Sequence, residues 1–148
     1  MRFAGLYYLI LGIFLTAFGC EQKEDELQTS SEELILGEWK WVESIYYDTP
    51  SGEPFVLNPD SVGYHITNTY LADGTYKTFI SNRMESTGLY WFDRIVYDKD
   101  NISDLRLFTQ KDEFLSSVNF DLSQDTLILD NTEADGARRV FVRIQENN

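Results

Sequence analysis

The sequence is poor in the residues that most often carry chemistry or covalent cross-links, because its 148 residues include one cysteine and one histidine. A single cysteine, Cys20, excludes an internal disulfide bond. Zinc sites are built mainly from cysteine and histidine side chains, and His65 is the only imidazole beside this one thiol, so no metal site is predicted. We also expect no cofactor and no catalysis, since no motif places a nucleophile or an orienting carboxylate beside His65.

Basic residues are also scarce, with 12 lysines and arginines against 25 aspartates and glutamates, which gives a net charge of −13. A chain this acidic is repelled by the phosphates of nucleic acids and by anionic lipid surfaces. Nucleic acid is therefore excluded as a partner. The paired carboxylates of a glycoside hydrolase are not excluded by composition, because their separation depends on the fold, but no pair stands out in the sequence.

Long hydrophobic runs are missing except near the start of the chain, where residues 6–18 are almost wholly apolar. Arg2 precedes this run, the small residue Ala17 lies near its end and Gly19 follows it. A basic residue, an apolar run and then small residues is the order of a secretory signal. A helix of about 13 residues rises only about 20 Å, whereas the hydrocarbon core of a bilayer is about 30 Å thick. The run therefore predicts a signal segment and not a transmembrane helix.

The residues from Leu15 to Cys20 resemble the lipobox of bacterial lipoproteins, in which a small residue precedes a cysteine that is acylated and becomes the mature N-terminus. The resemblance implies a signal peptide over residues 1–19 and lipidation of Cys20 by fatty acyl chains such as palmitate. It also implies that the protein is held in the cell envelope by this anchor, at the outer membrane. The membrane is then a partner through Cys20.

Residues 20–33 are mostly acidic and polar, and we expect them to form a flexible tether between the anchor and the folded domain. Within this segment, Lys23, Glu24 and Asp25 resemble the signal that sends some lipoproteins of Bacteroidetes to the cell surface. A plain solvated tether explains the same residues. The sequence leaves open whether the protein faces the periplasm or the surface.

Apolar residues alternate with polar ones along most of residues 34–148, in about eight short segments that start about 8 to 12 residues apart. The three prolines lie within residues 50–59, so we expect an irregular loop there. Short connections predict antiparallel neighbours, and a sheet of this length must close or fold over to hide its edges. The expected fold is all-β, an antiparallel up-and-down barrel of about eight strands, with a β-sandwich as the alternative.

Gly37, Glu38 and Trp39 begin the first of these segments and resemble the glycine-x-tryptophan signature of lipocalins. Most of the region up to Ile144 is similar to the lipocalin-like domains of Bacteroidetes lipoproteins. In that family the tryptophan packs at the closed end of the barrel, and an arginine from a late strand lies over it. The resemblance therefore implies a barrel plug made of Trp39 and Arg143.

The alternation places mainly apolar side chains on the inner face of the barrel, with the carboxylate of Glu43 among them. An eight-stranded barrel is either filled by its own side chains or holds one small ligand. We expect a small apolar or amphipathic ligand. The candidate ligand-binding residues are Trp41, Glu43, Tyr64, Ile66, Tyr70, Phe114 and Phe120, and the wider inward set adds Ile45, Asn68, Ser116 and Val118.

Two other functions fit the same pattern. In the first, the barrel is a filled scaffold that docks on another protein through the aromatic run 89–92 or the loop around residues 55–57. The sequence does not identify such a protein partner. In the second, an enzyme of this shape acts on its bound ligand through Glu43 and nearby tyrosines.

Overall fold

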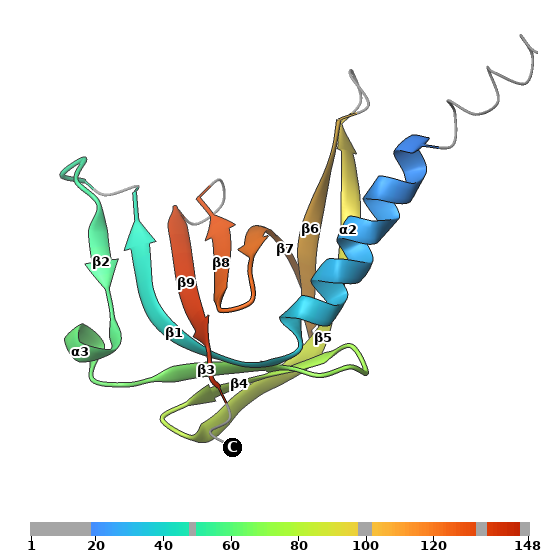
Figure 1. Ribbon diagram of the computed structural model, residues 1–148. Coiled ribbons are helices and arrows are strands. Elements are labelled where there is room, and N and C mark those ends of the chain that lie inside the picture. Colours follow the sequence, from blue (N-terminus) through green and yellow to red (C-terminus); the bar gives the residue numbers. More distant parts are fainter. Residues whose placement is uncertain (1–18, 48–49, 98–101, 133–135, 146–148) are drawn as a thin grey trace, which may run out of the picture.

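The structure is a computed structural model that describes residues 19–47, 50–97, 102–132 and 136–145 (Figure 1). Apart from Gly19, the expected signal segment lies outside the described residues. The described residues are mostly strand. The elements are α2 (Gly19–Ile35), β1 (Gly37–Tyr46), β2 (Phe55–Leu57), α3 (Pro59–Val62), β3 (Ile66–Tyr70), β4 (Thr75–Ile80), β5 (Arg83–Tyr97), β6 (Ile102–Lys111), β7 (Phe114–Leu122), β8 (Thr126–Asn131) and β9 (Ala137–Arg143).

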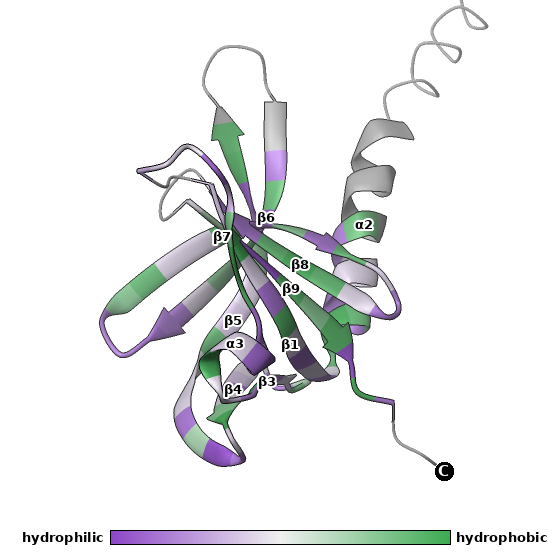
Figure 2. Ribbon diagram, turned by 90° about the vertical axis from the view of Figure 1, so that its left-hand side faces the viewer, coloured by the Kyte–Doolittle hydropathy of each residue, from purple (hydrophilic) through white to green (hydrophobic). Residues whose placement is uncertain are grey.

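The strands form one antiparallel sheet in the order β2-β1-β3-β4-β5-β6-β7-β8-β9, and β1 also pairs with β9. The β1–β9 pairing closes β1 and β3 to β9 into an eight-stranded barrel, with β2 as an additional strand. Among the eight barrel strands, neighbours in sequence are neighbours in the sheet, so the topology of the barrel is up-and-down. The predicted barrel is confirmed, and the alternative of a β-sandwich is not observed. Figure 2 shows hydrophobic and hydrophilic residues alternating along many of the strands.

The segment expected to be an irregular loop contains both β2 and α3. Both β2 and β3 pair with one edge of β1, at residues 44–46 and 37–40 respectively, and α3 lies between them in sequence. Asn58 caps α3: its side chain accepts a hydrogen bond from the backbone N–H of Ser61, and the Ser61 hydroxyl accepts one from the Asn58 N–H. Pro59 occupies the first turn, where its fixed φ suits a helix. A helical turn that begins at Pro59 therefore separates the two strands that pair with this edge of β1.

The expectation of a flexible tether over residues 20–33 is wrong, because this segment is helical in α2. Many of its residues are good helix formers, and Gln28 donates to Glu32 one turn later at 3.2 Å. Ser31 and Ile35, four positions apart, are buried on one face of the helix against the barrel. No helix within the described ranges is long and apolar enough to cross a membrane.

The position of α2 corresponds to a gap in the barrel wall. The β6–β7 ladder joins only residues 107–111 to 114–118. Beyond it, β6 continues with β5, and β7 continues with β8. Helix α2 contacts β5 and β7, on the two sides of this opening. In Figure 1 it runs beside the long β5–β6 hairpin.

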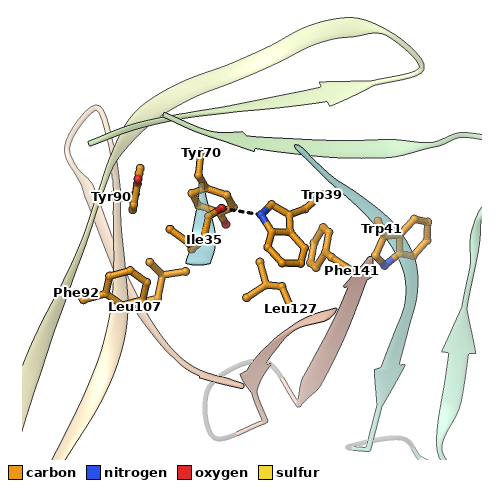
Figure 3. Packing of buried hydrophobic residues seen from close by; sticks show 9 residues of the cluster. All are labelled: Ile35, Trp39, Trp41, Tyr70, Tyr90, Phe92, Leu107, Leu127 and Phe141. Carbon is orange, nitrogen blue, oxygen red and sulfur yellow. Dashed lines mark hydrogen bonds between the residues drawn. The ribbon is translucent and has the colours of Figure 1, made fainter. Parts of the chain in front are cut away.

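Buried apolar side chains from α2 and six strands meet inside the barrel (Figure 3). Trp39, Ile35, Leu107 and Leu127 have no exposed surface. Figure 3 shows Phe141 between Trp39 and Trp41, and the hydrogen bond from the Trp39 indole to Ile35. The cluster consists of Ile35, Trp39, Trp41, Tyr70, Tyr90, Phe92, Leu107, Leu127 and Phe141.

Candidate ligand-binding site

Trp39 and Arg143 lie together where α2 joins the barrel. The guanidinium carbon of Arg143 is 4.2 Å from the centroid of the Trp39 ring, a cation–π distance. Arg143 also donates to the backbone carbonyls of Leu34, Leu36 and Gln124. Two of these carbonyls belong to the C-terminal end of α2 or the residue after it, where a cation is favourable. Arg143 therefore joins the end of α2 to the β7–β8 turn.

The expectation that Glu43 faces the barrel interior is wrong, because β1 contains a bulge between Trp41 and Glu43. Residues directly opposite each other in an antiparallel pair share a face. Trp41 lies opposite the buried Phe141, whereas Glu43 lies opposite Val140, the next residue along β9. Glu43 is therefore on the outer face. The bulge also exchanges the inward and outward positions of the residues that follow it. Ile45, which was expected to face inward, therefore lies on the outer face with Glu43.

Ser44 takes the inward position after the bulge. It is 5% exposed, and its hydroxyl accepts a hydrogen bond from the Trp41 indole at 3.0 Å. The inward position expected for the Glu43 carboxylate is therefore occupied by the Ser44 hydroxyl, which has a hydrogen-bond partner. A single inserted residue cannot be read from an alternating pattern, because the residue types on the two sides of the bulge do not reveal where the alternation slips.

The other predicted ligand-binding residues do not form one pocket. Trp41 stacks with Tyr64, with ring centroids 6.3 Å apart, and Ile66 packs on the edge of the core. Tyr70 is buried in the core, and its ring packs edge-on against the ring of Tyr90, with centroids 5.0 Å apart. Phe114 is 80% exposed at the start of β7. Of the predicted set, Phe120 lines the cleft described next.

A cleft of about 550 Å³ lies between α2 and the opening in the barrel wall. Leu27 and Ser31 contribute one side of it from α2. The other side comes from β5, β6 and β7. The residues from these strands are Arg94, Asp104, Leu105, Asn119, Phe120, Asp121 and Leu122.

The floor of the cleft is mainly apolar. Leu122 lies opposite the fully buried Leu127, and Phe120 contacts the ring of Phe92, with centroids 5.0 Å apart. Leu105 packs against the same core. Alternation along β6 and β7 puts these three leucine and phenylalanine side chains on the inner face of the barrel.

The rim of the cleft is polar and mostly acidic. Asp104 precedes Leu105 on β6, and Asn119 and Asp121 flank Phe120 on β7, so strand alternation directs these three side chains away from the inner face. Both carboxylates are exposed to solvent. Arg94 also lines the cleft, but it lies opposite the inward Leu105 and is therefore on the inner face of the barrel, beside the floor. The cleft therefore combines a mainly apolar floor, bordered by one guanidinium, with a hydrogen-bonding rim.

Sequence reasoning missed most of this cleft because it treated residues 20–33 as tether. The spacing of Leu27, Ser31 and Ile35 at intervals of four was the available signal, since it matches one face of a helix. The gap between β6 and β7 had no such signal. Which parts of two strands pair depends on curvature of the whole sheet and not on local residue types.

A second, smaller cleft of about 270 Å³ lies between the last turns of α2 and β5, beside Tyr90. The Tyr90 hydroxyl donates to the carbonyl of Leu71 at 2.8 Å. Burial raises the pKa of Tyr90, and the negative charges of Asp73 and Glu32 raise it further. Glu32 and Glu33 also line this cleft, so its rim is acidic, as is the rim of the larger cleft.

The described residues contain no group of three or more His, Cys, Asp or Glu side chains placed to hold a metal ion. His65 is exposed and is not among the residues that line the larger cleft. Comparison with known proteins gave no further guide to the site: no family model, no curated protein and no solved structure matched the chain.

Proposed function

We infer that this protein is a lipid-anchored, extracytoplasmic binding protein of the lipocalin-like type, which holds one small apolar or amphipathic molecule and does not transform it. The observation that carries this proposal is the cleft under α2. Its volume of about 550 Å³ falls in the range of about 300 to 1,000 Å³ that is usual for small-molecule sites. An apolar floor with polar groups at the rim suits an amphipathic molecule better than a fully polar one.

Fluorescence of N-phenyl-1-naphthylamine, an apolar probe, tests this binding on the purified barrel with α2. The wild type should bind the probe with saturation. Leu105→Trp fills the floor of the cleft and should weaken binding by roughly tenfold or more, which corresponds to about 1.4 kcal/mol. Val142→Trp is the matched control, because Val142 lies on β9 and is not among the residues that line the cleft.

Circular dichroism establishes that both variants fold. An absence of saturable binding to the wild type would refute the proposal. So would equal loss of binding in Leu105→Trp and Val142→Trp, since the probe would then be reporting general changes of the surface.

The proposed anchor is supported by the lipobox-like residues that end at Cys20. Two or more acyl chains hold a protein firmly on a membrane, because each buried methylene contributes about 0.8 kcal/mol. Cys20→Ser in the full chain, expressed in a bacterium that processes lipoproteins, should move the protein from the membrane fraction to the soluble fraction. Retention of the variant in the outer-membrane fraction would contradict acylation at this residue.

The second candidate function is docking on another envelope protein, with the barrel as scaffold. It is favoured by the β6–β7 hairpin, at whose tip Phe114 is 80% and Leu115 63% exposed. Consecutive strand residues point to opposite faces, so both faces of this tip are apolar. Phe114→Ser with Leu115→Ser should leave probe binding unchanged if the cleft is the functional site.

A further inference from the structure

We propose that the cleft beside α2 takes a short peptide in extended conformation, which adds a strand to the open edge of β7. This inference rests on the binding function proposed above and adds to it the chemical class of the ligand. It comes from the way the ladder between β6 and β7 ends. Pairing stops at Leu107 and Val118, although both strands extend beyond these residues.

The cleft runs along the edge of β7 and not over one of its faces. Residues 119–122 all line it. Consecutive strand residues point to opposite faces, so a cleft over one face would be lined by alternate residues only. On β6, the neighbours Asp104 and Leu105 also line the cleft together. The cleft therefore lies between two strand edges, and its shape suits a backbone in extended conformation.

The backbone groups that face the cleft follow from the pairing of β7 with β8. The Ser123 N–H donates to the Thr126 carbonyl at 2.9 Å, and every second residue of β7 counted back from Ser123 is hydrogen-bonded to β8. The residues between them, Phe120 and Leu122, therefore direct their N–H and C=O groups toward the cleft. Among the described residues, no strand pairs with this edge beyond the end of the β6–β7 ladder. An open edge of this kind can bind an extended peptide through main-chain hydrogen bonds.

The side chains around the cleft define the sequence that such a peptide would carry. Its inward side chains would cover the mainly apolar floor, which Arg94 borders. Its outward side chains would lie on the same face as the exposed carboxylates of Asp104 and Asp121. Opposite charges on one face of neighbouring strands attract each other. We therefore expect a peptide in which apolar and basic residues alternate.

Displacement of N-phenyl-1-naphthylamine by a capped peptide of leucine alternating with lysine tests this proposal, with 1-decanol as a ligand that has no backbone. The peptide should displace the probe with saturation. An analogue with every backbone nitrogen methylated keeps the side chains and the charge but has no N–H donors. It should bind roughly tenfold more weakly, because it cannot donate hydrogen bonds to the edge of β7.

Two double variants separate recognition at the rim from the general attraction of a basic peptide to a chain of net charge −13. Asp104→Asn with Asp121→Asn should weaken peptide binding about fivefold, as two partly exposed ion pairs would give, and keep the affinity for 1-decanol. Asp112→Asn with Glu113→Gln, in the exposed β6–β7 turn, changes the net charge equally and should keep the affinity for the peptide. Equal losses in both variants would overturn the preference for basic residues.

Amide hydrogen exchange followed by NMR locates the bound peptide. Saturating peptide should slow the exchange of Phe120 and Leu122, whose N–H groups face the cleft, and leave that of Asn119 and Asp121, which face β8, unchanged. Equal slowing at all four residues would overturn pairing at this edge.

Displacement of the probe by 1-decanol but not by the peptide would overturn the peptide as ligand and leave the binding function intact. Equal affinity for the peptide and its methylated analogue would overturn the addition of a strand. Slow exchange at Phe120 and Leu122 that appears without peptide, and only at high protein concentration, would assign this edge to a second copy of the chain and would also overturn the proposal. Failure of the probe itself to bind would refute the binding function.

Discussion

Arg143 shows how one long side chain joins segments that are far apart in the sequence. It contacts the Trp39 ring, two carbonyls at the end of α2 and one carbonyl in the β7–β8 turn. A lysine carries the same charge, but its single ammonium cannot reproduce the planar fork that reaches all three carbonyls. The role of the residue therefore depends on its geometry as well as on its charge.

Trp39→Ala should destabilise the barrel by about 3 to 5 kcal/mol, which is usual for truncation of a large buried aromatic residue. Trp39 has no exposed surface, and its indole N–H donates to the carbonyl of Ile35 at 2.7 Å. Urea unfolding followed by circular dichroism measures the change. A loss below 1 kcal/mol would remove Trp39 from the stabilising core.

At the scale of elements, α2 is the feature that distinguishes this barrel from a bare ring of strands. Of residues 27–35, the part of α2 whose side chains the structure describes, only Ser31 and Ile35 are buried, and the helix sequence is mostly acidic or polar. Its attachment depends on Ile35, the Arg143 contacts and a hydrogen bond from Gln28 to the carbonyl of Phe92 at 3.4 Å. Most of these contacts lie in the second half of the helix.

Ile35→Ala should cost about 2 to 5 kcal/mol, because the side chain is fully buried where α2 meets the barrel. Leu27→Ala is the matched control on the same helix. Leu27 is 56% exposed, and a surface substitution of this kind usually changes stability by about 0.5 kcal/mol or less. Urea unfolding measures both variants. Similar losses in the two would mean that α2 is not held mainly by its last turn.

The fold class was predictable from the sequence because alternation and short turns act locally and repeat in every strand. Residues 85–97 show the limit of that reasoning, because the charged pair Asp93 and Arg94 favours a break between two strands, whereas the structure has one strand, β5. Asp93 is exposed and Arg94 is half-buried, so water reaches both side chains and the pairing of β5 with β6 continues through them.

The candidate site was less predictable than the fold, because it depends on features that alternation does not encode. The bulge after Trp41 turned Glu43 outward, and the missing half of the β6–β7 ladder created the opening that α2 covers. Phe120 was identified as a ligand-binding candidate because its inward position is purely local. The residues beside it in the cleft come from elements whose placement depends on the closed barrel.

At the scale of the whole molecule, the barrel interior suppresses the ionisation of tyrosine. Burial is the main cause that raises the pKa of Tyr70 above its ordinary value of 10.0, and the nearby Tyr76 adds to it. The neutral phenol is thus favoured in the folded state. Its contribution to stability is complete below pH 10 and is lost as the pH rises beyond that value.

We therefore expect the urea midpoint of the wild type to fall steeply above pH 10. Tyr70→Phe should flatten this dependence, because phenylalanine has no proton to lose. The ultraviolet absorbance of tyrosinate, followed along the same pH series, shows whether the buried phenol ionises only as the barrel unfolds. An identical pH dependence in the wild type and Tyr70→Phe would contradict this assignment.

The pairing of β1 with β9 has a consequence for how the chain reaches this structure. The barrel is closed by contacts between its first and last strands, such as the pairing of Trp39 with Arg143 near the two ends of the described chain. Contacts of such long range make folding slow, with rates in the range of milliseconds to seconds for all-β domains. Until the last strand has paired with the first, both edges of the incomplete sheet stay open and can pair with a neighbouring chain.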